Sequence, residues 1–183
     1  MKAMNLSNCY PSLSGRVIVI TGGASGIGAS MVEAFCRQKA KVAFLDLQDE
    51  AAQQLIDMLA SDNDTSLPHY YRCDLRDVEA LQAAIAKLRR DLGPVEVLVN
   101  NAANDDRHDF RDVSVAYWDE AVAVNLRHYF FASQAVYEDM KLSGGSIINL
   151  GSMSWHATPG GMPAYTSSKA AVEGLTRGLA RDM

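Results

Sequence analysis

The glycine-rich stretch at residues 21–28 (TGGASGIG) is the sequence feature that most constrains the fold. It stands between an apolar run at 17–20 and a segment of helical composition at 29–39. Glycines let the backbone turn sharply and approach an anion closely, because they carry no Cβ. A helix start offers unpaired N–H groups and the positive end of the helix dipole. Strand, turn and helix together predict a seat for a phosphate group, although such a stretch alone also fits an ordinary turn.

The rest of the chain alternates apolar runs with segments of helical spacing, which predicts βαβ units. We predict strands at 16–20, 41–45, 69–73, 95–99 and 146–150, and helices at 29–39, 48–60, 78–91, 114–141 and from 163 onward. The strands are apolar without alternation, as expected when helices cover both faces of a parallel sheet. The predicted fold is therefore α/β, a three-layer α/β/α arrangement over residues 15–183, preceded by a tail at 1–14.

Composition excludes several classes of function. The 183 residues are 48% hydrophobic and 21% charged, with a net charge of −5, which is typical of a globular domain. There is no basic run for nucleic acid or a membrane surface, no apolar run near ~18 residues, and no signal-like N-terminus. The three widely spaced cysteines fit reduced thiols in the cytoplasm. No metal site is expected, because His108, His128 and His156 lack ligand spacing.

Two carboxylates end predicted strands, where ligands bind in open α/β sheets. Asp46 can accept hydrogen bonds from both hydroxyls of an adenosine ribose and would repel a 2′-phosphate. Neither Leu47 nor Ser25 supplies a cation for that phosphate, so NAD is expected rather than NADP. The alternative is a solvated aspartate at a strand end. Asp74 would accept from the adenine amino group, or would instead cap the helix that begins near Asp77.

The strongest chemical signal is a tyrosine followed four positions later by a lysine on one helix. Positions i and i+4 share a helix face, so Lys169 lies beside Tyr165. A nearby cation favours the phenolate, so Tyr165 can accept an alcohol proton as hydride leaves the neighbouring carbon. Ser152 can hydrogen-bond the same oxygen, and Asn125 can bind a water that links Lys169 to solvent. Singly, each residue also has an ordinary structural interpretation.

These motifs resemble those of the short-chain dehydrogenase/reductase family. The match covers residues 15–183 and includes the glycine turn, Asp74, the NNAA segment at 100–103, and Asn125, Ser152, Tyr165 and Lys169. The resemblance implies a Rossmann-type doubly wound fold, a Ser–Tyr–Lys–Asn tetrad, and a homotetramer or dimer. Ala103 replaces the family's glycine and slightly narrows the space beside the cofactor. Predicted cofactor contacts are Gly22, Ser25, Gly26, Ile27, Gly28, Asp46, Asp74, Leu75, Asn101, Ala102, Tyr165 and Lys169.

Further segments at 10–13, 104–108, 117–119, 125–128 and 151–156 resemble bacterial sugar 1-dehydrogenases acting on D-xylose or galactose. That resemblance implies oxidation of the anomeric hydroxyl of an aldose to a lactone. A sugar pocket needs paired donors and acceptors beside an apolar face, and His156 is one further donor. Alternatively, 105–108 is a solvated or salt-bridged loop and Trp155 only packs beneath it. Predicted substrate contacts are Asn104, Asp105, Ser152, Ser154, Trp155 and Tyr165.

The resemblance also has a gap, because the family continues with further strands, a Pro-Gly loop and a substrate lid. The predicted sheet lacks those last strands and helices, so we expect a fragment or a damaged subunit with an exposed sheet edge. The parent protein is then active, and this chain is weakly active or inactive. Two other functions stay open: a dehydrogenase or reductase for another alcohol or ketone (a steroid or 3-oxoacyl substrate), and a nucleotide-binding subunit without catalysis.

Overall fold

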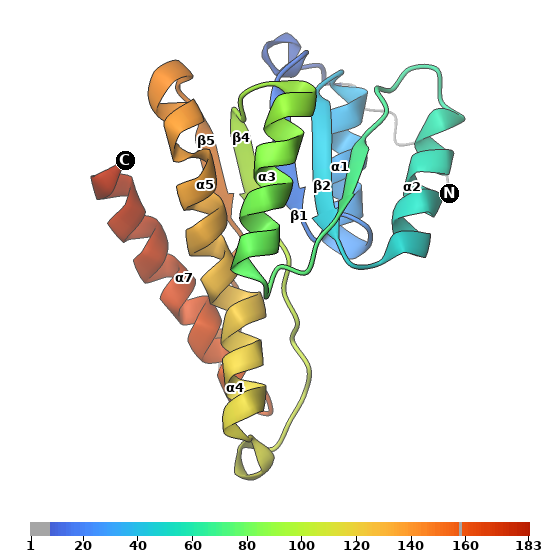
Figure 1. The fold of residues 1–183 in the computed structure, drawn as a ribbon. Coiled ribbons are helices and arrows are strands. Elements are labelled where there is room, and N and C mark those ends of the chain that lie inside the picture. The colour runs from blue at the N-terminus through green and yellow to red at the C-terminus, as the bar shows by residue number, and fades with distance from the viewer. Residues whose placement is uncertain (1–7, 158) are drawn as a thin grey trace.

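The computed structural model describes residues 8–157 and 159–183, which form a five-stranded parallel sheet flanked by helices (Figure 1). The strand order is β3-β2-β1-β4-β5. The chain builds outward from β1 to β3, then returns to the other side of β1 for β4 and β5. This reversal makes a topological switch point between β1 and β4, where such sheets bind ligands. The strands are β1 (Val17–Thr21), β2 (Lys41–Asp46), β3 (His69–Arg72), β4 (Val97–Asn100) and β5 (Ser146–Asn149).

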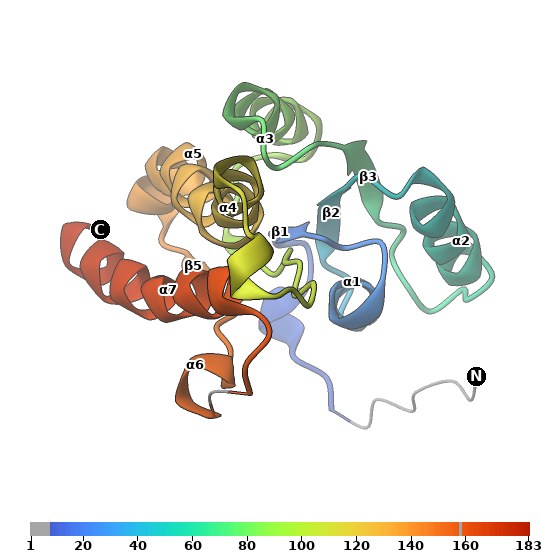
Figure 2. The ribbon, with the colours of Figure 1, turned by 90° about the horizontal axis from the view of Figure 1, so that it is seen from below.

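The sheet separates two apolar layers, so the predicted three-layer arrangement is confirmed (Figure 2). Alternate strand residues point to opposite faces. Ile18 and Ile20 of β1 pack toward α1 and α2, whereas Val17 and Val19 pack toward α3 and α5. All five β1 residues are buried, as both covered faces require. The helices are α1 (Gly26–Arg37), α2 (Asp49–Ala60), α3 (Val78–Leu92), α4 (Val115–Val122), α5 (His128–Ser143), α6 (Ser154–Ala157) and α7 (Pro163–Asp182).

The helix predicted at 114–141 is present as continuous helical structure over 115–143, but it is not a single α-helix. A π-helical turn at Ala123–Arg127 separates α4 from α5. Asn125 lies in this turn, and its Nδ2 donates to the carbonyl oxygens of Ala121 and Asn104. The bond to Asn104 ties the helix to the loop after β4, a contact that the helical spacing of this segment does not reveal. Such π turns concentrate at functional sites.

Smaller differences lie at the predicted loops and ends. The helix α6 falls where a loop was expected, and α1 begins at Gly26, inside the glycine turn. The first seven residues of the predicted tail lie outside the described residues. Its remainder is not free: a 3₁₀ turn at Pro11–Leu13 precedes β1, and the N–H of Tyr10 donates to Oε1 of Gln38 at 2.7 Å.

The helix α7 brings the predicted catalytic pair to the carboxyl ends of the strands. It packs against α4, α6 and the π turn, and runs beside α5 in Figure 1. It begins at Pro163, a favoured first helical position, after Gly160 and Gly161 with φ of +74° and +68°. β5 forms the edge of the sheet opposite β3, and Ile148 of β5 is 44% exposed, in line with the expected exposed edge.

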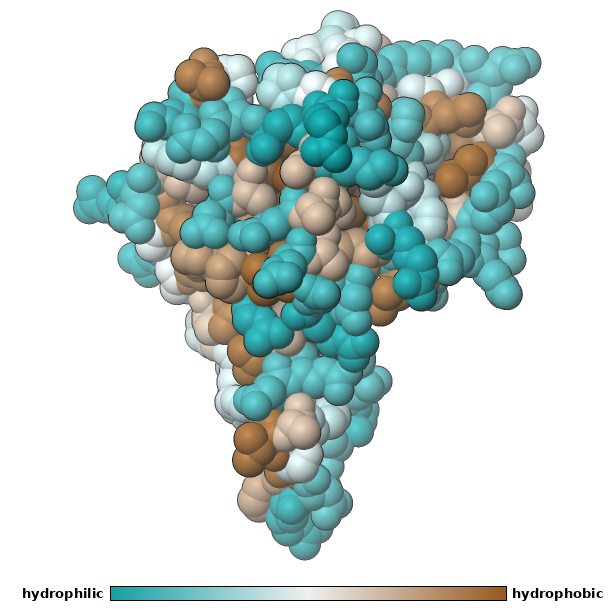
Figure 3. Space-filling view, in the orientation of Figure 1, coloured by the Kyte–Doolittle hydropathy of each residue, from teal (hydrophilic) through white to brown (hydrophobic). Residues whose placement is uncertain are grey.

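The surface is mostly hydrophilic on the face of Figure 3, with apolar patches on the part around α4 that projects below the sheet. Exposed apolar side chains of this part include Phe110, Val115 and Trp118. Within the described residues, no helix combines the length and the apolar character that a membrane crossing requires.

Candidate active site

The glycine turn is packed so tightly that three of its glycines, Gly22, Gly23 and Gly28, have no room for a side chain. A Cβ on Gly22, whose φ is +68°, would lie 2.8 Å from Cα of Ala102, and one on Gly28 would overlap the carbonyl oxygen of Gly22. Asn101 fixes the turn to the end of β4, because its Nδ2 donates to the carbonyl oxygens of Thr21 and Gly22, each at 2.9 Å. The turn therefore leaves backbone at the start of α1 open to an anion.

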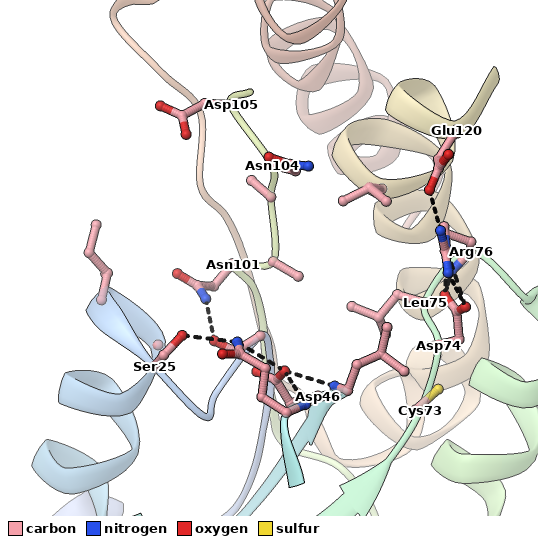
Figure 4. Close-up of a pocket in the computed structure, with 18 of the residues that line it drawn as sticks. Ser25, Asp46, Cys73, Asp74, Leu75, Arg76, Asn101, Asn104, Asp105 and Glu120 are labelled. Atoms are coloured by element: carbon pink, nitrogen blue, oxygen red, sulfur yellow. Dashed lines mark hydrogen bonds and ion pairs between the residues drawn. The ribbon is translucent and has the colours of Figure 1, made fainter. Parts of the chain in front are cut away.

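A cavity of about 610 Å³ lies over this turn, at the carboxyl ends of the central strands (Figure 4). Its wall joins the β1–α1 turn, the ends of β2 and β3, the loop after β4, and α4. Of the predicted cofactor residues, Gly26 and Lys169 do not line it. Those that do are Gly22, Ser25, Ile27, Gly28, Asp46, Asp74, Leu75, Asn101, Ala102 and Tyr165.

Asp46 is 8% exposed and is held by three backbone N–H groups. Its Oδ2 accepts from Ala24 at 2.9 Å, and its Oδ1 accepts from Leu47 at 2.7 Å and Gln48 at 3.1 Å. The Gln48 side chain also donates to Oγ of Ser25 at 3.1 Å. A carboxylate has about four acceptor sites, so the remaining capacity is on Oδ2. The solvated-aspartate interpretation does not fit this burial.

Asp74 does not cap a helix, so that alternative is wrong. The cap of α3 is Asp77, whose side chain accepts from the N–H of Ala80. Asp74 instead binds Arg76 through both oxygens, at 2.9 Å from Nε and 2.7 Å from Nη2, and Arg76 lowers the pKa of Asp74. Arg76 pairs at its other end with Glu120 of α4, as Figure 4 shows. No pattern in the sequence marks Gln48, Arg76 or Glu120 as lining this cavity.

Tyr165 and Lys169 lie together on α7. The ammonium of Lys169 is 5.7 Å from the centre of the Tyr165 ring, and Tyr165 is half-buried at the cavity wall. Lys169 is 1% exposed, and burial lowers its pKa from 10.5 to about 8. It donates to the hydroxyl of Tyr129 at 2.7 Å and to the carbonyl of Leu150 at 2.8 Å. A buried cation thus stands beside the phenol, as the spacing predicts.

The other two residues of the predicted tetrad, Asn125 and Ser152, hydrogen-bond the local backbone. Asn125 is buried, and its Oδ1 accepts from the N–H of Asn104 at 2.8 Å, which leaves one lone pair on this oxygen. Ser152 is half-buried, and its Oγ accepts from the N–H of Ser154 at 3.1 Å. A bond from Ser152 to a substrate and a water on Asn125 stay predictions.

The predicted substrate residues are divided between two hollows. Asn104 and Asp105 line the nucleotide-sized cavity with Tyr165, and Figure 4 shows them opposite Asp74. Ser152 and Trp155 line a second hollow of about 590 Å³ together with Lys169. The Trp155 ring lies 3.4 Å from that of His156.

Ser154 lines neither hollow, and its Oγ is buried without a hydrogen-bond partner among the described residues. Part of the hydrogen-bonding capacity of the loop after β4 is used within the loop, because Asn104 and Asp106 exchange two hydrogen bonds. Outside residues 1–7 and 158, no cluster of His, Cys, Asp and Glu could hold a metal ion.

The chain is similar to a known protein family and to two sugar dehydrogenases. A family model described as short chain dehydrogenase matches residues 16–183. The chain is 50% identical over 178 residues to a D-xylose 1-dehydrogenase of Caulobacter vibrioides, covering 97% of this chain and 69% of that protein. It is 46% identical over 175 residues to a probable galactose dehydrogenase of Rhizobium meliloti, covering 95% and 68%.

Among solved structures, a metagenomic short-chain oxidoreductase in complex with NADP superimposes with a TM-score of 0.87 at 28% identity. The match covers 93% of this chain and 77% of that one.

Proposed function

The chain belongs to the short chain dehydrogenase family, and on that premise we propose that it uses NAD to oxidise the C1 hydroxyl of an aldose to the lactone. The observation that carries the chemistry is the buried ammonium of Lys169 beside the Tyr165 phenol, at the wall of a nucleotide-sized cavity. Residues 15–183 then act as one nucleotide-binding and catalytic domain.

The size and the lining of the cavity support a dinucleotide as its ligand. The glycine turn packs closely at the start of α1, where the helix N-terminus would bind a pyrophosphate, and Asp46 stands at the end of β2 for a ribose hydroxyl. NAD is favoured over NADP because the Asp46 carboxylate is buried, charged and fixed by backbone donors. Asp74 and Leu75 would border the adenine end.

The chain's own residues then handle the proton. A bound nicotinamide supplies the hydride acceptor. Tyr165 takes the proton of the sugar hydroxyl as general base, and the ammonium of Lys169 stabilises the resulting phenolate. Ser152 holds the reacting oxygen in place. Asn125 holds the loop that carries Asn104, and a water on its free lone pair would connect Lys169 with solvent.

A sugar substrate is supported by the D-xylose and galactose dehydrogenase relatives and by the polar loop after β4. Asn104 and Asp105 offer donors and acceptors beside Tyr165, and Trp155 offers an aromatic face at the second hollow. A site built on hydroxyl hydrogen bonds can reject analogues that lack them.

A panel of aldoses and secondary alcohols with NAD⁺ and with NADP⁺ tests the proposal. We expect reduction of NAD⁺ by D-xylose or D-galactose and formation of the corresponding lactone. If only a simple secondary alcohol, a steroid or a 3-oxoacyl substrate reacts, the sugar assignment fails. If nothing reacts and the protein still binds NADH, a binding subunit without catalysis is the better interpretation. The assay includes both residues 1–183 and the longest protein that the gene encodes, because weak or no turnover is predicted for residues 1–183 alone.

A cytoplasmic location and assembly into a homotetramer or dimer are also proposals, supported by the composition and by the family resemblance. Size-exclusion chromatography with light scattering decides the second.

A further inference from the structure

Tyr129 is the buried partner of Lys169, and its place comes from the start of α5. Tyr129 is fully buried, and its hydroxyl lies 2.7 Å from the Lys169 ammonium. The nitrogen of this ammonium is 4.9 Å from the centre of the Tyr129 ring. Lys169 carries three N–H groups and has two hydrogen-bond acceptors among the described residues, Tyr129 and the carbonyl of Leu150. One of the two hydrogen-bond acceptors of this buried ammonium is therefore the phenol oxygen of Tyr129.

The Tyr129 hydroxyl is oriented to act as an acceptor toward the lysine. Its own proton points to the carbonyl oxygens of Leu150 at 3.2 Å and Ala102 at 3.5 Å. Burial raises the pKa of Tyr129, so it stays neutral through the physiological range. A neutral oxygen with its lone pairs toward Lys169 stabilises the ammonium more than the uncharged amine, because a charged donor makes the stronger hydrogen bond.

The Tyr129 contact matters because Lys169 lies beside Tyr165, and these two groups together can give up one proton in two ways. When the pair has lost one proton, that proton is missing either from the phenol or from the lysine. Only the first form, phenolate beside ammonium, can accept a substrate proton. We propose that Tyr129 is a positioning residue that keeps the shared proton on Lys169 and so leaves Tyr165 as the base. This inference rests on the proposed function of Tyr165.

The other groups that face Lys169 do not replace this contact. His128, next to Tyr129 on α5, is fully buried, and burial lowers its pKa to about 3, so it is uncharged near neutral pH. From α6 and α7, His156, Glu173 and Arg177 line the second hollow with Lys169 and are exposed. Their charges are screened by solvent.

Tyr129→Phe tests the proposal, because it removes the hydroxyl and keeps the ring. Tyr137→Phe is the matched control: Tyr137 is also on α5, and Lys141 lies 5.6 Å from its ring, away from the site. We measure kcat/KM for aldose oxidation against pH. In Tyr129→Phe we expect the plateau of kcat/KM at high pH to fall about 3- to 10-fold, because the lysine now loses the proton. The acidic limb of the curve should move to lower pH by the logarithm of that factor.

At low pH the activity of Tyr129→Phe stays unchanged, since there the lysine is protonated in both proteins. Tyr137→Phe follows the original curve throughout. A uniform loss at every pH would show a merely structural role, and an unchanged curve would show that the hydroxyl does not hold the proton. Either result overturns the proposal.

A second measurement needs neither cofactor nor turnover. In protein labelled with ¹³C at lysine Cε, the resonance of Lys169, assigned with Lys169→Met, should titrate near pH 8. In Tyr129→Phe this midpoint should fall by about one pH unit, and in Tyr137→Phe it should not move. If the original protein oxidises no substrate, the proposed function fails, but this titration still decides whether Tyr129 holds the lysine proton.

If Tyr129→Phe does not fold, Tyr129→Gln and Tyr129→Met replace it as a pair of similar size. The glutamine oxygen can accept from the ammonium and should preserve the Lys169 midpoint, whereas methionine should lower it. Equal midpoints in the two variants would overturn the proposal.

Discussion

Replacing Asp46 by asparagine should change cofactor selectivity and stability by separate physical routes. The carboxylate is buried and charged, so it opposes a second negative charge in the cavity. For a phosphate charge at about 5 Å and an effective dielectric constant of about 20, Coulomb's law gives about 3 kcal/mol. Removing the charge should therefore raise the affinity for NADPH relative to NADH by on the order of 100-fold.

The stability effect follows from the hydrogen bonds of Asp46. An amide has one carbonyl oxygen, and if this oxygen accepts from Leu47 and Gln48, the NH₂ group faces the N–H of Ala24. An unsatisfied buried donor costs about 1–3 kcal/mol. We therefore expect Asp46→Asn to lower the free energy of unfolding by that amount.

Fluorescence titrations with NADH and NADPH measure the first effect, and urea unfolding measures the second. Asp57→Asn is the control, because it removes one negative charge from an exposed position on α2. It should alter neither the cofactor selectivity nor the free energy of unfolding. If the ratio of NADPH affinity to NADH affinity in Asp46→Asn stays within threefold of the original, the Asp46 charge does not set the cofactor selectivity.

Three further changes probe other parts of the site. Gly28→Ala should abolish cofactor binding and cost about 3 kcal/mol or more in urea unfolding, because its Cβ would overlap the carbonyl of Gly22; near-normal NADH binding would contradict this. Lys169 has a pKa of about 8 in the folded chain and 10.5 when free, so the buried charge lowers the free energy of unfolding below pH 8. This free energy should rise as the pH increases from 8 toward 10.5. Lys169→Met should lack that rise and should lose aldose oxidation. Glu120→Gln should weaken NADH binding through Arg76 while changing stability by less than about 1 kcal/mol, since the pair is largely exposed; an unaltered dissociation constant would argue against a role for it.

The elements around the cavity follow from local patterns and were predictable from the sequence. The apolar strands, the glycine turn, Asp46 at the end of β2 and the pair of Tyr165 and Lys169 each depend on residues close together in the chain. Their relative positions follow because parallel strands bring their carboxyl ends to one edge of the sheet.

The contacts that tune the site join distant segments, and no periodicity encodes them. Tyr129 reaches Lys169 across 40 positions, and Arg76 reaches Glu120 across 44. The π turn at Ala123–Arg127 could not be predicted either, because Asn125 in this turn hydrogen-bonds to Asn104, which lies 21 positions earlier in a loop. In the sequence, Tyr129 is one aromatic residue in an apolar helix segment, and only its burial against Lys169 gives it a chemical role.

Tyr165 is the proposed base of an NAD-linked sugar oxidation, and one comparison of rates tests this role. The test is the initial rate of NADH formation from D-xylose and D-galactose by the original protein and by Tyr165→Phe, with NADH binding measured in both. We predict that the variant binds NADH as the original does and loses about 1000-fold in kcat/KM. Equal rates in the two proteins would contradict the claim.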